Sequence, residues 1–223
     1  MIVEFLSETA LKAVLEQPDT TKRQGIRDLF YMVLMYDSAA RNSELLNLRV
    51  GDFLHHSSTP YVYLRGKGNK MRAVPLMSNT IDHFHRFRQV FHLDSSPDQF
   101  MFYVMRGGIK QQMSDDNVAR FLKVYGSLAK QHCNEVPDKI YPHMFRRTRS
   151  MHLYRAGMPL ALLSEWLGHE DPETTLIYAY ADTEMKRRAI EKATKGVNPL
   201  VNDQEVAIWE GNDEMIRKLY GLR

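Results

Sequence analysis

Cysteine is nearly absent from this sequence: Cys133 is the only one among 223 residues. One thiol cannot close a disulfide within the chain, and it cannot build a cysteine-rich metal site. The sequence therefore excludes a fold held together by disulfides, and it favours a protein that works in a reducing compartment.

Long hydrophobic runs are missing as well. The first ten residues, MIVEFLSETA, do not combine a basic stretch with a long apolar run, as a secretory signal would. No segment reaches the roughly 18 apolar residues that a membrane-spanning helix requires. Together with the cysteine content, this predicts a cytoplasmic protein without a membrane partner.

A strong excess of one charge is also missing. The formal net charge at pH 7 is +3 and the isoelectric point is near 8.9, which permits a nucleic-acid partner without requiring one. The positive charges are nevertheless gathered in two basic islands. The islands are Arg65, Lys67, Lys70 and Arg72, and Lys139, Arg146, Arg147, Arg149 and Arg155. Because charge clusters are usually solvated faces, the islands alone do not decide the function.

The histidines also lack the spacing of known metal-binding motifs. The nine histidines include the neighbours His55 and His56, and the pair His83 and His85. Neither pair has the spacing of an H-E-x-x-H helix or of a cysteine–histidine finger. We therefore expect no metal and no other cofactor.

What the sequence does contain is enough apolar material for a core. Hydrophobic residues make up 43% of the chain, which suffices for one substantial globular body. Apolar residues recur at helical spacing, as in Ile26, Leu29, Phe30 and Val33. The predicted helices cover about 7–17, 26–33, 42–48, 81–91, 114–129, 142–155, 159–168, 172–180 and 182–193.

Two segments break the helical pattern. Residues 61–64 and 71–76 are strand-like, and the glycine-containing stretch 66–69 supplies a turn between them. The fold class that we expect is therefore mainly α-helical with one small antiparallel β-sheet. The predicted N-caps are Ser7, Ser114 and either Asn42 or Ser43.

Several polar residues match the needs of phosphodiester cleavage without a metal: a nucleophile, cations around the phosphate oxygens, and an acid for the leaving oxygen. Arg41 precedes a predicted helix, and Glu44 follows three residues later, where its carboxylate could orient the guanidinium. His143 and Arg146 are also three residues apart and share one helix face. Lys67 lies in a glycine-flanked turn, which suits a mobile general acid.

The same residues have ordinary structural explanations. A free tyrosine has a pKa near ~10 and is mostly protonated at pH 7, so core packing would explain an isolated Tyr178. His169, next to a glycine, would suit a helix cap or the core. Lys67 would suit a solvated turn, and Glu44 would suit the start of a helix.

Four motifs follow one another along the chain. They are ARNSELL at 40–46, GKGNKMRAVPL at 66–76, HMFRRTRSMHLYRAG at 143–157 and LGHEDPETTLIYAY at 167–180. With this ordered set the sequence resembles the tyrosine recombinases, also called phage or lambda-type integrases, which include the Xer-type enzymes. The resemblance extends from about Leu6 to Asp182.

The resemblance implies a set of site residues. The implied catalytic residues are Arg41, Lys67, His143, Arg146, His169 and Tyr178, with Glu44 in support. Tyr178 would be the nucleophile that forms a 3′-phosphotyrosine bond, and Arg41 and Arg146 would grip the scissile phosphate. His143 and His169 would complete the pocket, and Lys67 would protonate the leaving 5′ oxygen.

The activity that the resemblance implies is site-specific DNA recombination, without metal or ATP, in the integration or excision of mobile DNA. The implied partners are double-stranded DNA at a specific recombination site and further copies of the chain, assembled as a tetramer. Lys70, Arg147 and Arg149 are predicted DNA contacts. The acidic tail 201–223 is predicted to dock on a neighbouring subunit.

The sequence also departs from the family pattern. Tyr180 stands where many members have a histidine two residues after the nucleophile, which leaves a choice between two tyrosines. Tyr178 is favoured as the nucleophile because it directly follows Thr174-Thr175-Leu176-Ile177. Too few residues precede the first motif for the usual N-terminal DNA-binding domain. We expect a catalytic domain at 1–200, a tail at 201–223, and no core-binding domain.

A second function remains open at this point. The segment from His143 to Gly168 has the pattern of a helix-turn-helix, which would suit a DNA-binding regulator without catalytic activity. Such a regulator would have no need of a nucleophile. The complete set of cations together with Tyr178 favours the enzyme.

Overall fold

The computed structural model describes residues 4–56, 58–66, 68, 70–168, 173–181, 187 and 190. The chain divides into two units, Met1–Ala181 and Asp182–Arg223. In the second unit the described residues Arg187 and Ile190 are helical and exposed. The predicted helix at 182–193 and the tail at 201–223 otherwise lie outside the described residues, as do the predicted helix start at Asp171 and Pro172.

The first unit is mainly helical, as the sequence predicts, and carries two small antiparallel sheets in its described part. Its helices are α1 (Glu8–Leu15), α2 (Arg23–Ser38), α3 (Asn42–Leu46), α4 (Ser78–Phe91), α5 (Asp115–Lys130), α6 (Pro142–Arg155), α7 (Leu160–Leu167) and α8 (Glu173–Ala181), with the short 3-10 helix η1 (Val50–Asp52). Its strands are β1 (Phe53–Leu54), β2 (Tyr61–Arg65), β3 (Met71–Pro75), β4 (Tyr103–Arg106) and β5 (Ile109–Gln112).

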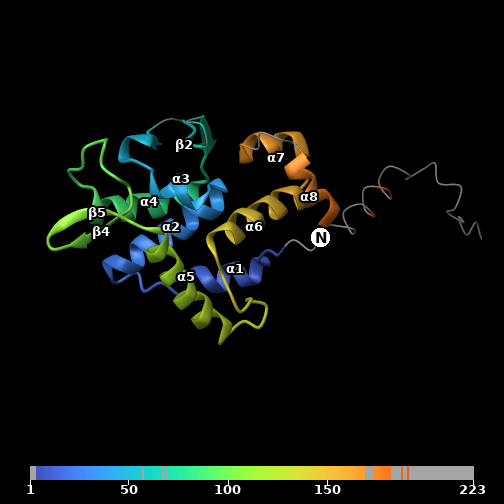
Figure 1. Ribbon diagram of the computed structural model, residues 1–223, viewed down its shortest axis with the longest axis horizontal. Helices are drawn as coiled ribbons and strands as arrows, with labels where there is room; N and C mark the ends of the chain where they lie inside the picture. Colours follow the sequence, from blue (N-terminus) through green and yellow to red (C-terminus); the bar gives the residue numbers. More distant parts are fainter. Residues whose placement is uncertain are drawn as a thin grey trace, which may run out of the picture. The chain divides into compact units, whose positions relative to one another are not determined.

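Helix α2 is the centre of the core. It packs against α4 on one side and α6 on another, and α7 and α8 pack in turn on α6 (Figure 1). The ring of Phe30 is 1% exposed and lies 4.9 Å from the ring of Phe87 and 5.6 Å from that of Phe102, centre to centre. This aromatic cluster joins α2 to α4 and to the segment before β4.

The two sheets have different surroundings. In the first, with strand order β1-β2-β3, Val62 pairs with Val74 across the β2–β3 hairpin, and both side chains are buried. The second sheet, β4 with β5, is a separate hairpin, so the prediction of one sheet is wrong. Every residue of β5 is exposed, so that strand has no apolar alternation to detect. Its turn residues, Gly107 and Gly108, were the available signal.

The helix boundaries partly follow the predicted caps. Ser7 and Ser114 accept hydrogen bonds from backbone amides at the starts of α1 and α5, as predicted. The N-cap of helix α3 is Arg41, one residue before Asn42 and two before Ser43, the two predicted caps. Helix α1 ends at Leu15, short of the predicted end, since Pro18 disfavours helical backbone in the residue before it.

A buried carboxylate ties three helices together. Asp37, near the end of α2, accepts hydrogen bonds from the backbone of Met77 (2.8 Å) and the hydroxyl of Thr80 (2.7 Å) at the start of α4. It also accepts one from Arg149 of α6 (2.9 Å). The exposed side-chain fractions are 5% for Asp37 and 15% for Arg149, so this ion pair is largely shielded from water.

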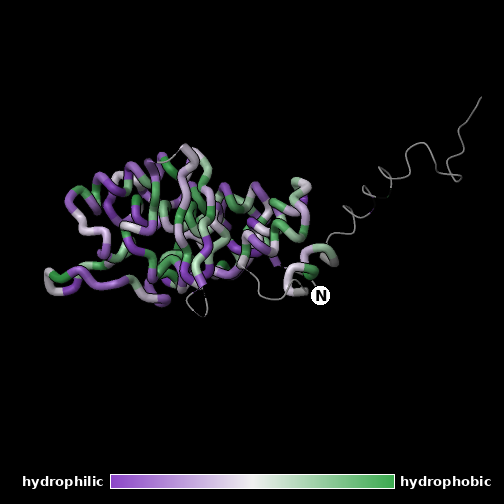
Figure 2. The backbone as a smooth tube through the Cα atoms, turned by 90° about the horizontal axis from the view of Figure 1, so that it is seen from above, coloured by the Kyte–Doolittle hydropathy of each residue, from purple (hydrophilic) through white to green (hydrophobic). Residues whose placement is uncertain are grey.

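Apolar and polar residues alternate at short intervals along the backbone. Figure 2 shows no long hydrophobic stretch in the part of the chain that is coloured. Among the described residues, no helix has both the length and the apolar character needed to cross a bilayer. The apolar residues serve instead as the inner faces of amphipathic helices.

Replacing Arg149 by Met should destabilise the fold by about 3 kcal/mol, because it leaves the Asp37 carboxylate buried without its counter-charge. Urea unfolding followed by circular dichroism measures the change. Replacing the exposed Arg120 by Met is the control and should stay within about 0.5 kcal/mol. Equal effects of the two substitutions would show that the Asp37–Arg149 pair does not stabilise the fold.

Candidate active site

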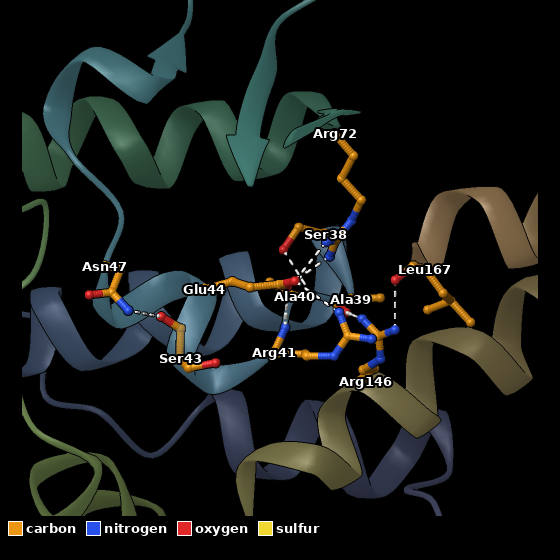
Figure 3. A network of polar contacts seen from close by, with 10 residues as sticks. All are labelled: Ser38, Ala39, Ala40, Arg41, Ser43, Glu44, Asn47, Arg72, Arg146 and Leu167. Atoms are coloured by element: carbon orange, nitrogen blue, oxygen red, sulfur yellow. Dashed lines mark hydrogen bonds and ion pairs between the residues drawn. The ribbon is translucent and has the colours of Figure 1, made fainter. Parts of the chain in front are cut away.

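Glu44 is the only acid among a group of arginines drawn in Figure 3. It lies in the first turn of α3, and its carboxylate accepts a hydrogen bond from the backbone N–H of Arg41 (2.7 Å) and another from the Arg41 guanidinium (3.0 Å). The side chain of Glu44 is 2% exposed, while that of Arg41 is 40% exposed. The buried acid therefore holds an arginine whose outer edge still reaches the surface.

Arg72 approaches the same carboxylate from the other side. Its two terminal nitrogens donate to the two oxygens of Glu44 at 2.7 Å and 2.8 Å, a paired geometry that only an arginine can form (Figure 3). Sequence reasoning placed Arg72 in a basic island but gave it no role in the site. The available signal was its position inside the GKGNKMRAVPL motif, on the strand that follows the hairpin turn.

Arg146 lies deepest in the group, with an exposed fraction of 1%. Its guanidinium donates to the backbone carbonyl of Ala39 (2.7 Å) and to that of Leu167 (2.7 Å), at the ends of α2 and α7 (Figure 3). Ala39 has left-handed backbone with φ of 50°, a conformation that costs an alanine roughly 1 kcal/mol. That strained residue presents its carbonyl to Arg146.

The charges of this group do not balance. The residues of the close-up include three guanidiniums and one carboxylate, that of Glu44. Burial, together with the positive charges of Arg41 and Arg72, lowers the pKa of Arg146 to about 10. Burial would raise the pKa of Glu44, but the hydrogen bonds and charge of Arg72, aided by Arg41, outweigh it and lower that pKa. Arg146 and Glu44 are therefore both charged at pH 7. Since guanidiniums outnumber the carboxylate, the group carries an excess of positive charge.

His143 lies one helical turn before Arg146 on α6, as the i, i+3 spacing predicts. Its side chain is exposed. Partial desolvation lowers its pKa, and the positive charges of Arg147, Arg146 and Arg41 lower it further. The imidazole is therefore neutral at pH 7 and able to accept a proton.

Tyr178 extends from α8 into an apolar cluster. Its exposed fraction is 2%, and it packs with Ala39, Met151, Leu163 and Leu167. It lies near enough to Arg146 that the negative charge of an ionised phenol raises the arginine's pKa, a smaller effect than that of burial and of the neighbouring arginines. The structure thus brings Tyr178 next to the arginine group.

Two of the predicted site residues, Lys67 and His169, lie outside the described residues. Their chain neighbours Gly66 and Gly168 are described, and both lie at the arginine group. A Cβ atom added to Gly66 would stand 3.5 Å from an oxygen of Glu44, and one added to Gly168 would stand 3.1 Å from Cδ of Arg72. Gly66 therefore lies beside Glu44, and Gly168 lies beside Arg72.

The three predicted DNA contacts have different surroundings. Lys70 is exposed at the base of the hairpin. Arg147 is half-buried and donates to the hydroxyl of Tyr141 at 3.3 Å. Arg149 donates to Asp37 and is 15% exposed, and its contact with DNA stays a prediction. Among described residues, no group of three or more histidines, cysteines or acids is arranged to hold a metal.

Comparison with known families finds a match to the phage integrase family over residues 4–185. The chain is 30% identical over 189 residues to the tyrosine recombinase XerA of Pyrococcus horikoshii, covering 84% of this chain and 60% of the relative. It is 31% identical over 179 residues to XerD of Staphylococcus epidermidis, covering 79% and 57%. The chain thus spans between 57% and 60% of the length of these two relatives.

Comparison with solved structures finds the same fold. XerH recombinase bound to its difH substrate before cleavage has a TM-score of 0.69 at 21% identity, over 85% of this chain and 54% of that one. The catalytic domain of bacteriophage HP1 integrase has a TM-score of 0.53 at 21% identity, over 90% of this chain and 98% of that one. The described fold is that of a tyrosine recombinase catalytic domain.

His143 should titrate below the usual pKa of histidine, about 6.5, because of desolvation and its arginine neighbours. Replacing Arg147 by Met should raise that pKa, and replacing the exposed Arg106 by Met should not. Since the pKa is lowered by folding, the contribution of His143 to stability is complete above about pH 6.5 and declines as the pH falls toward the folded pKa. NMR of the ring C–H signals measures the titration; a midpoint at or above 6.5 would contradict it.

Proposed function

Because the chain belongs to the phage integrase family, we propose that it cuts and rejoins DNA strands at specific sites through a 3′-phosphotyrosine intermediate. The observation that carries this proposal is the excess of positive charge on Arg41, Arg72 and Arg146, next to Tyr178. Because one carboxylate does not balance three guanidiniums, the group as a whole favours an anion beside it. The scissile phosphate of DNA is that anion.

The proposed reaction needs no metal, because the arginines stabilise the charge that develops on the phosphate. The oxygen of Tyr178 bonds to the phosphorus while the bond to the 5′ oxygen breaks. The phenolic proton passes to a neutral imidazole, for which His143 is available, with His169 completing the pocket. Lys67 gives the leaving 5′ oxygen a proton. Attack by a 5′ hydroxyl reverses these steps and reseals a strand without ATP.

The burial of Tyr178 adds a requirement to this mechanism. A phenol that is 2% exposed cannot meet the phosphate of a duplex while the side chains of Leu163 and Leu167 cover it. We therefore propose that α8 shifts relative to α7 when DNA binds.

The proposed partner is double-stranded DNA at a specific recombination site. XerH has been solved with its difH substrate, and an integrase of the transposon Tn1549 with transposon right-end DNA. By analogy, we propose that this chain acts in the integration or excision of mobile DNA and works in the cytoplasm. The regulator alternative is less favoured, because a DNA-binding module would need neither a nucleophile nor a buried arginine group beside it.

Incubation with a nicked suicide duplex should give a covalent protein–DNA adduct with the wild-type chain and none with the Tyr178→Phe variant. The nick lets the strand fragment that carries the freed 5′ hydroxyl leave, so the phosphotyrosine bond accumulates. Denaturing gel electrophoresis with labelled DNA measures the adduct. The matched control is Tyr180→Phe, which should keep the adduct; its loss there, or its survival in Tyr178→Phe, would show that Tyr178 is not the nucleophile.

Tetramer assembly on DNA is a further part of the proposal. Deleting 212–223 should weaken assembly on a complete recombination site, because the tail is proposed to dock on a neighbouring subunit. Cleavage of a half-site in the adduct assay should partly survive, since one chain holds the whole proposed set of catalytic residues. Sedimentation of the DNA complexes measures the assembly, and unchanged complexes after the deletion would refute the docking role.

A further inference from the structure

We propose that Arg72 is a positioning residue of this site, which holds Glu44 in place and through it orients Arg41 toward the scissile phosphate. The inference rests on the proposed function, because it assigns Arg72 a part in the same reaction. Arg72 acts through another side chain and is distinct from the two arginines to which the sequence motifs assign the phosphate.

The hydrogen bonds of Glu44 carry the argument. Each carboxylate oxygen accepts two of them: Oε1 from the guanidiniums of Arg41 and Arg72, and Oε2 from the backbone of Arg41 and again from Arg72. A carboxylate has about four lone-pair positions, so its acceptor capacity is fully used. Half of the bonds that fix the plane of this carboxylate therefore come from Arg72.

A lysine at position 72 could not form the paired hydrogen bonds that Arg72 makes to Glu44. Its fork spans both oxygens at 2.7 Å and 2.8 Å, and thereby fixes the carboxylate against rotation. Lysine would offer one point charge to the same acid and leave the carboxylate free to turn. Since Arg41 is bonded to both oxygens of Glu44, a turn of the carboxylate moves the Arg41 guanidinium as well.

Burial separates Arg72 from a direct role on DNA. Its side chain is 15% exposed, against 40% for Arg41. Its Nε atom is buried and has no hydrogen-bond partner within the described part of the chain. The side chain therefore faces Glu44 and the turn at Gly168, where its Cδ would lie 3.1 Å from an added Cβ atom. This packing leaves Arg72 little surface for a phosphate.

Arg72 also connects the segments that carry the other predicted catalytic residues. It stands on β3, the second strand of the hairpin whose turn contains Lys67, and it packs on Gly168, which precedes His169. Gly66, which precedes Lys67 in the sequence, lies against Glu44: a Cβ atom added to it would stand 3.5 Å from Oε1 of Glu44. The Arg72–Glu44 pair is thus the point at which the first arginine box, the hairpin and the Gly168 turn meet.

The test compares single-turnover cleavage of the suicide duplex with binding of the same DNA. Arg72→Met should slow adduct formation about 100-fold, the size expected when a reacting group is misplaced by about 1 Å. Arg72→Lys should recover only a small part of that rate. The dissociation constant should stay within about threefold, and the slope of log K against log salt should change by less than the ~0.9 of one phosphate contact.

A matched control separates positioning from loss of stability. Arg27 is an arginine of similar burial, 13% exposed, paired with the fully buried Asp28 outside the site. Arg27→Met should lower the urea midpoint in a similar way without slowing adduct formation. Equal slowing by Arg27→Met and Arg72→Met would refute the inference, because the effect would then be structural.

A double-variant experiment tests the route through Glu44. If Arg72 acts through Glu44, adding Arg72→Met to Glu44→Gln should slow cleavage by less than threefold beyond Glu44→Gln alone. If the rate losses of Arg72→Met and Glu44→Gln multiply in the double variant, the positioning role is overturned. It is also overturned if Arg72→Met weakens DNA binding and reduces the slope of log K against log salt by about one.

The inference and the proposed function can fail separately. A wild-type chain that forms an adduct through Tyr178, with an Arg72→Met variant that cleaves at the wild-type rate, would refute the inference alone. A wild-type chain that forms no adduct would refute the function. In that case urea unfolding of Arg72→Met, Glu44→Gln and the double variant shows whether the two residues are coupled. Additive shifts of the urea midpoint would overturn the inference as well.

Discussion

One buried carboxylate among several guanidiniums is the constraint on which the rest of this site depends. Arginines repel one another at close range, and burial increases that repulsion because water no longer screens it. Glu44 makes the approach possible for Arg41 and Arg72 by accepting hydrogen bonds from both. It does not neutralise the group, and the charge that remains is what suits the site to a phosphate.

The fold brings this group together from distant parts of the chain. Arg41 follows α2, Arg72 stands on β3, Arg146 lies on α6 and Tyr178 on α8. Helix α2 organises them, because α4 and α6 pack on it and its last turn ends at the strained residue Ala39. The Asp37 carboxylate, two residues earlier, bonds both α4 and α6 and so fixes the helices around that turn.

The sequence predicted much of the fold. The structure brings four of the predicted site residues together, Arg41, Glu44, Arg146 and Tyr178, and their roles stay predictions. Helix α5 begins where its apolar spacing and the cap residue Ser114 place it, and α6 begins at Pro142, as predicted. The β4–β5 hairpin could not be found in this way, because β5 buries none of its side chains. The role of Arg72 escaped for a different reason: a surface cluster and a buried ion pair look alike in sequence, and only tertiary contacts distinguish them. For the same reason the sequence did not reveal the ion pair of Arg149 with Asp37.

The two hydrogen bonds that Arg146 donates to backbone carbonyls affect the affinity of the site for an anion. An unrestrained arginine side chain has many rotamers, and ordering it removes roughly 1.5 to 2 kcal/mol of conformational entropy. The backbone of Ala39 and Leu167 imposes that order as the chain folds. An oxyanion that enters the site therefore meets a guanidinium already aligned in one plane, and its binding free energy is not reduced by freezing that side chain.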